Sequence, residues 1–210
     1  MFRKIFWGFI VCLCFGGLGL SEALACACCA DRGDYSISVR KPDSYLLDEM
    51  QKIDFAPKAT LYTTEVGLEP DVIRGLPADF YQDDSAAVSA DFGFSGLFAA
   101  KQWKLTFKDY KGRTGNLLLT QPPTILRFAV DTHTDEANTN VTLYKEWRIQ
   151  GVAKGTGIFQ PGMAPNTKFF LVFQGRGNNC DGAADFSHWR VEITGAKASY
   201  AFWGQVARRP

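Results

Sequence analysis

Histidine and the common catalytic motifs are scarce in this sequence. Only His133 and His188 occur among its 210 residues. No Gly-x-Gly-x-x-Gly follows a strand pattern, no phosphate-binding loop is present, and Gly93-Phe94-Ser95-Gly96-Leu97 lacks the last glycine of a nucleophile elbow. The sequence therefore supports no enzymatic activity, and a non-catalytic role is favoured.

An excess of charge of one sign is also missing. The chain has 23 Lys and Arg against 22 Asp and Glu, and loss of residues 1–25 would leave 21 of each. Nucleic acids and anionic membrane surfaces are recognised through clustered basic residues. We therefore expect no nucleic-acid partner, which leaves a small molecule, a glycan or a protein.

The first 25 residues have the composition of a cleaved signal peptide. Arg3 and Lys4 precede an apolar run over residues 5–20, and Ala23 and Ala25 form the Ala-x-Ala pattern of a signal-peptidase site. The run is shorter than the ~20 residues that span a bilayer. We expect export to the periplasm or the extracellular space, and no transmembrane segment after cleavage.

Lipid attachment at Cys26 is the less favoured form of export. A lipoprotein signal places a large aliphatic residue three positions before the acylated cysteine, and Ala23 stands there. The remaining residues, 26–210, are predicted to form a single β-rich domain, because their length suits one hydrophobic core.

Helical periodicity is rare in residues 26–210, and period-two alternation is common. One short helix is expected after Asp43 and Ser44, with apolar positions at Leu46, Leu47, Met50 and Ile53. Alternating segments, such as residues 35–40, 103–108, 117–120, 167–174 and 189–193, indicate strands joined by hairpin turns. The predicted fold is all-β: an antiparallel β-sandwich or small β-barrel of about eight or nine strands.

Three details of this pattern can be tested against a structure. Residues 35–40 are expected to form a half-buried strand, with Tyr35, Ile37 and Val39 on its buried face. Residues 151–157 are expected to form a bend. Phe202 and Trp203 are neighbours in one strand and must point to opposite faces, so one of them is expected on an outer surface.

Residues 67–90 break the alternation and are expected to form a long surface loop. Asp79, Asp83, Asp84 and Asp91 could bind calcium, but the glycine and closing glutamate of an EF-hand are missing. Solvated charge is the favoured interpretation. Asp131, His133 and Asp135 similarly could hold a hard cation, and a solvated loop is again favoured.

The cysteines give the most specific functional signal. Cys12 and Cys14 leave with the signal peptide, so Cys26, Cys28, Cys29 and Cys180 remain. In an exported chain we expect Cys180 to form a disulfide with one of the other three. A second bond is harder, because adjacent Cα atoms lie ~3.8 Å apart and disulfides need ~4.4–6.8 Å.

Clustered thiolates suggest an alternative. Cys26, Cys28 and Cys29, with Cys180, could bind Cu(I) or act as a redox centre, and His188 could approach as a further ligand. The favoured prediction is an exported binding or interaction domain whose N-terminus is tied to the Cys180 loop by a disulfide. The soft-metal or thiol-redox protein is the alternative, with copper as its cofactor.

Overall fold

The computed structural model describes residues 33–62, 73–80, 91–99, 102–132, 142–178 and 180–207. Its elements, in chain order, are strands (β), an α-helix (α1) and 3₁₀ helices (η). They are β1 (Tyr35–Arg40), α1 (Ser44–Gln51), β2 (Phe55–Leu61), η2 (Ala78–Phe80), β3 (Asp91–Phe98), β4 (Gln102–Lys108), β5 (Thr114–Thr120), β6 (Ile125–Val130), β7 (Leu143–Gly157), η3 (Gln160–Gly162), β8 (Lys168–Gly177), η4 (Ala183–Asp185), β9 (Phe186–Thr194) and β10 (Ser199–Val206).

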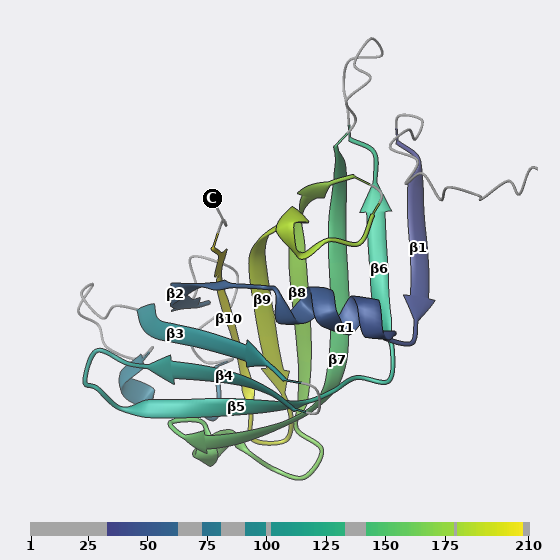
Figure 1. Ribbon diagram of the computed structural model, residues 1–210. Helices are drawn as coiled ribbons and strands as arrows, with labels where there is room; N and C mark the ends of the chain where they lie inside the picture. The colour runs from purple at the N-terminus through teal and green to yellow at the C-terminus, as the bar shows by residue number, and fades with distance from the viewer. Residues whose placement is uncertain are drawn as a thin grey trace, which may run out of the picture.

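The strands form one antiparallel sheet that closes into a barrel (Figure 1). Its order is β1-β6-β7-β5-β4-β3-β2-β10-β9-β8, and β8 pairs again with β7. Eight strands therefore close the ring, while β6 and β1 extend from the first half of β7. The all-β prediction with one short helix is confirmed, and the barrel is the form that it takes.

Aromatic side chains fill the barrel interior because alternate positions of each strand in the closed ring point inward. The Phe55 ring, for example, contacts the rings of Phe94, Phe98, Phe173 and Trp189, with centroids 5.3 to 6.1 Å apart. The largest fully buried side chains are Trp103, Trp147, Trp189, Tyr200, Phe107, Phe159, Phe169, Phe173, Phe202, Met50, Leu61 and Leu105. The interior is a packed core of rings.

The glycine-rich segment 151–157 continues strand β7, so the expected bend is wrong. Here β7 exchanges its neighbour β6 for β5, with Leu119 opposite Ala153 and Gly115 opposite Gly157. A Cβ at Gly151 would lie 2.7 Å from the Phe169 ring. Glycine is needed there so that β7 can pack closely against an aromatic core. In the sequence, glycines required for packing look the same as glycines that mark a turn.

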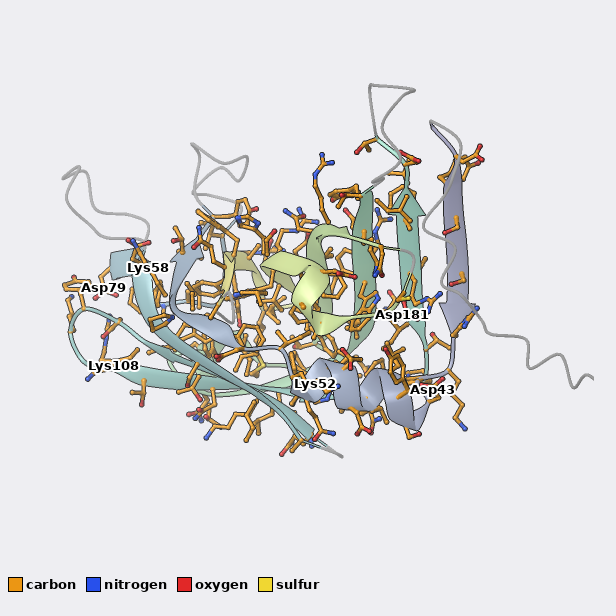
Figure 2. The ribbon with its side chains drawn as sticks, turned by 45° about the horizontal axis from the view of Figure 1, so that its top comes forward. Asp43, Lys52, Lys58, Asp79, Lys108 and Asp181 are labelled. Carbon is orange, nitrogen blue, oxygen red and sulfur yellow. The ribbon has the colours of Figure 1, made fainter. Side chains whose placement is uncertain are left out.

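Helix α1 begins and packs as its sequence predicts. The Asp43 side chain accepts a hydrogen bond from the Leu46 backbone N–H at 2.8 Å, which makes it the N-cap. Leu46 and Met50 lie on the buried face of the helix, and Ile53 follows it into the core. Figure 2 marks the two ends of the helix with Asp43 and Lys52.

Strand β1 is present, but its apolar side chains do not face the core. Tyr35, Ile37 and Val39 are 69%, 59% and 62% exposed. The strand was predicted correctly, but the predicted burial of these three side chains is wrong. β1 lies outside the closed ring, where it pairs with β6, so neither face of β1 reaches the barrel interior.

The described part of the long 67–90 segment, residues 73–80, packs on the barrel. Ile73, Leu76 and Phe80 are buried, and Arg74 forms a β-bridge with Ser199. Asp79 is 2.5 Å from Lys111 Nζ and 2.9 Å from an Arg113 nitrogen. The hydrogen bond from Lys111, with Arg113 adding to it, lowers the Asp79 pKa despite some desolvation. Ion pairs thus account for this acidic residue. Asp83 and Asp84 lie outside the described residues.

Candidate functional site

The outer face of β7, β8, β9 and β10 carries a hollow of about 410 Å³, which we call the outer hollow. Alternation points Trp203 of β10 and Phe170 of β8 out of the barrel, and Tyr62 follows β2 beside them. The Tyr62 and Trp203 rings lie 6.4 Å apart. The full lining is Tyr62, Glu146, Arg148, Phe170, Val172, Gln174, His188, Trp189, Arg190 and Trp203.

Trp203 is the half-buried tryptophan of the described chain. Trp103, Trp147 and Trp189 are each exposed by 2% or less, whereas Trp203 keeps part of its surface in solvent. Its neighbour Phe202 is fully buried. The prediction that one of these two rings lies on an outer surface is confirmed.

Charges at the outer hollow are compensated locally. Arg148 Nε lies 2.5 Å from a Glu146 carboxylate oxygen, and an Arg190 nitrogen lies 2.9 Å from Glu192. Glu146 also accepts a hydrogen bond from the Tyr144 hydroxyl at 2.5 Å. Burial, together with that bond, raises the pKa of Tyr144 to about 12. The hollow therefore combines apolar rings with hydrogen-bonding groups and has little net charge.

A larger cavity of about 710 Å³ opens at the end of the barrel beside α1, and we call it the end cavity. Glu49 and Lys52 of α1 line one side, and Asp185, Ser187 and His188 line another. His188 contributes to both the end cavity and the outer hollow. It stands where the two meet.

Between β8 and β9, residue 178 and residues 180–185 carry Cys180 and lie against the barrel; we call these residues the cysteine loop. Lys145 of β7, only 4% exposed, donates from Nζ to the Cys180 carbonyl oxygen and to Asp185 at 2.5 Å. The Ala183 backbone N–H donates to Glu49 of α1 at 2.9 Å. These bonds hold both ends of the loop.

The middle of the cysteine loop reaches across β7 toward β6 and β1. Asp181 forms an ion pair with Arg127 of β6, and its carbonyl oxygen accepts a hydrogen bond from the Tyr45 hydroxyl at 2.8 Å. Figure 2 shows Asp181 on this loop, near α1. Arg127 also donates to the Ser38 hydroxyl of β1 at 3.3 Å. One arginine therefore links the cysteine loop to the strand nearest the N-terminal cysteines in sequence.

The structure describes only part of the predicted metal site. Cys26, Cys28 and Cys29, together with His133, lie outside the described residues, while Cys180 is placed in the cysteine loop. Within residues 33–207, less the undescribed gaps, no three His, Cys, Asp or Glu side chains gather in a way that could hold a metal ion. The copper hypothesis therefore stays a prediction.

Ser187 and His188 are in contact, with 2.9 Å between the serine Oγ and the histidine Nδ1. The contact joins sequence neighbours beside a register shift between β8 and β9. A catalytic pair also needs a group that orients the histidine through its other nitrogen. Among the described residues, none donates or accepts a hydrogen bond at His188 Nε2.

Lys145 is the important residue that the sequence reasoning missed. It sits on the inward phase of β7, between Leu143 and Trp147. A lysine on the apolar side of an alternating strand breaks the pattern, and that break was the available signal. Such a lysine needs a buried partner, which the cysteine loop supplies through Asp185.

Comparison with known proteins identifies no relative: no protein-family model, no curated protein and no solved structure matches this chain. Among the described residues, no helix has the length and apolar character needed to cross a bilayer. The function must therefore be argued from the geometry of the fold.

Proposed function

We propose that this protein is an exported, non-catalytic binding domain that takes a neutral, polar ligand with an apolar face on the outer hollow. A sugar ring of a glycan has this chemistry. The observation that carries the proposal is the contrast between an interior filled by rings and an outer hollow where Trp203 remains accessible.

The filled interior directs the search to the outside of the barrel. Barrels that bind small ligands inside keep a lumen open between their strands. Here Phe107, Phe159 and Phe202 contact one another across the interior, with centroids 4.6 to 5.9 Å apart. A ligand inside would have to displace core rings, so a surface site is favoured.

The composition of the outer hollow defines the ligand class. Trp203, Tyr62 and Phe170 offer apolar ring surface, and Gln174 and His188 offer hydrogen-bonding groups. Concave sites of apolar surface with a few polar groups are typical of small-ligand binding. Because Arg148 is paired with Glu146, a strongly charged ligand would have to break an ion pair. A neutral ligand pays no such cost.

A panel of neutral trisaccharides tests the proposal. Cellotriose, chitotriose and maltotriose are titrated by calorimetry, with trigalacturonic acid as the charged comparison. We expect at least one neutral sugar to bind, and Trp203→Ala to weaken its binding by about tenfold or more, because ring contact area is lost. Tyr110→Ala, at an exposed ring in the β4–β5 turn, is the matched control and should bind normally.

We further propose that a disulfide joins Cys180 to one of Cys26, Cys28 and Cys29. Support comes from the cysteine loop, which extends toward β1, and from chain length. Cys29 precedes Tyr35 by six residues, which can span up to ~20 Å. Such a bond would close a long loop and stabilise the chain by roughly 4–5 kcal/mol in the chain-entropy account.

Intact mass under non-reducing conditions separates this disulfide from copper binding. Residues 26–210 should weigh about 2 Da less than the reduced chain for each disulfide formed, and should carry no metal. A mass that includes copper, with free thiols, would favour the soft-metal alternative. In that case Cys26, Cys28, Cys29 and Cys180 would be the ligands to replace with serine first.

A further inference from the structure

An exposed apolar surface lies at the outer margin of the sheet, where β1 stands beyond β6 at the right of Figure 1. Tyr35, Ile37 and Val39 share one face of β1. They lie opposite Val130, Phe128 and Leu126 of β6, which are half-buried. We call these six residues the edge patch. Contiguous exposed apolar surface of this kind marks an interaction site in soluble proteins.

The main chain of β1 is arranged to receive another strand. The Gly33 N–H donates to the Asp131 carbonyl oxygen, and the Asp131 N–H donates to the Asp34 carbonyl oxygen. With Gly33 at φ +83°, this is a G1 bulge, which fixes the phase of the ladder that follows. The main-chain carbonyl group of Asp34 points toward β6. Because main-chain groups alternate in direction along a strand, the N–H and C=O groups of Tyr35, Ile37 and Val39 point away from β6.

Within the part of the chain that the structure describes, the edge of β1 carries none of the usual protection against strand pairing. Natural edge strands are blunted by proline, by charged side chains or by a cover. Residues 35–39 contain no proline and no charge. Among the described residues, β6 is the strand with which β1 pairs. Charges stand only at its two ends, with Asp34 before the strand and Arg40 at its last position.

We propose that β1 pairs with β1 of a second copy of this chain, antiparallel and centred on Ile37, to form a twofold-symmetric dimer. In that register Ile37 lies opposite the partner's Ile37, and Tyr35 lies opposite the partner's Val39. These are the residues whose main-chain groups face outward, so each pair can exchange two hydrogen bonds. Register and main-chain direction therefore agree.

Charge complementarity supports the same register. Asp34 comes opposite the partner's Arg40, and by symmetry Arg40 comes opposite the partner's Asp34. Both side chains lie on the face of β1 that also carries Ser36 and Ser38, and both are exposed. Neither forms an ion pair with a described residue. A symmetric pairing of β1 thus matches opposite charges at both ends of an uncharged strand.

The dimer would place both outer hollows on the same side of one continuous sheet, because the twofold axis is perpendicular to the sheet. A polymeric ligand with repeated units could then bind at two sites together. This consequence depends on the proposed function, whereas the dimer itself does not. The two can therefore fail separately.

Sedimentation equilibrium of the purified exported chain, over concentrations up to about 100 µM, tests the proposal with a charge exchange. We expect a dimer for the native chain. Asp34→Arg and Arg40→Asp should each weaken dimerisation by roughly tenfold, because attraction becomes repulsion at both ends. The double variant Asp34→Arg/Arg40→Asp should restore it. Lys154→Asp, on the exposed face of β7, is the matched control and should leave the dimer unchanged.

The contrary results are equally definite. A monomer throughout the concentration range would mean that another segment or partner covers the edge, and would overturn the proposal. A dimer that persists in both single variants, or one that the double variant does not restore although its thermal unfolding matches that of the native chain, would place the interface elsewhere.

Discussion

The interior of the barrel and the outer face of β7–β10 both carry aromatic rings, and they use them differently. Inside, Trp189 stacks on Phe94 with centroids 4.4 Å apart and is 1% exposed. Outside, the Trp203 ring lies 6.4 Å from that of Tyr62 and borders the outer hollow. The inner rings are fixed by packing on all sides, and the outer ring is left with an open side.

This difference separates stability from recognition within the same strands. An inner ring contributes free energy of folding through buried apolar area and dense contacts. An outer ring beside an open hollow contributes little to folding and can gain contacts when a ligand covers it. The following predictions test whether the two faces divide their roles in this way.

The largest difference should appear on truncating one tryptophan from each face. Trp189→Ala should lower the free energy of unfolding by about 3–5 kcal/mol, because a large cavity opens in the core. Trp203→Ala should lower it by about 1 kcal/mol or less. Urea titration followed by circular dichroism measures both. Equal losses would remove the distinction between the faces.

The buried lysine should give the next largest effect. Lys145→Met removes the buried cation that pairs with Asp185 and donates to the Cys180 carbonyl oxygen, so we expect a loss of about 2–3 kcal/mol. Glu192→Gln, which breaks the exposed pair with Arg190, should cost about 0.5 kcal/mol or less. If both variants unfold at the same urea concentration, the cysteine loop is not held as described.

A smaller effect is expected at alkaline pH. Folding raises the pKa of Tyr144 from 10.0 to about 12, mainly because the hydroxyl becomes buried. Between these values the unfolded chain loses the tyrosine proton while the folded chain keeps it, so this contribution to stability is present below pH 10 and is lost as pH rises toward 12. Tyr144→Phe should show a shallower loss of stability in that range. Equal slopes for the two proteins would contradict the assignment.

The helix and the strands with clear alternation were predictable because each has a local signal, whereas β3, with glycines at two of its positions, was not predicted. Asp43 precedes α1 and caps it, and Trp103, Leu105 and Phe107 alternate into the core as expected. Barrel closure was not predictable, because the pairing of β7 with both β5 and β8 depends on contacts between distant segments. The predicted burial of Tyr35, Ile37 and Val39 in β1 was wrong for the same reason. Alternation shows that a strand has two different faces, but it does not show whether either face packs against the core.

The candidate site was predictable only in fragments. Alternation of Phe202 and Trp203 was enough to expect an outer aromatic ring. Tyr62 and Phe170 come from distant positions in the chain, so their meeting with Trp203 depends on the strand order β2-β10-β9-β8. The cysteines were visible in the sequence. The path of the cysteine loop toward β6 depends on Lys145 and Arg127, whose partners no local pattern indicates.

The most direct measurement is the quenching of tryptophan fluorescence by iodide, with and without the neutral trisaccharide that binds. Trp103, Trp147 and Trp189 are buried, so Trp203 should account for most of the quenching in residues 26–210. The account predicts that bound sugar reduces the quenching and that Trp203→Phe abolishes the sugar-dependent change. Sugar binding that leaves the quenching of Trp203 unaltered would place the site elsewhere and contradict the account.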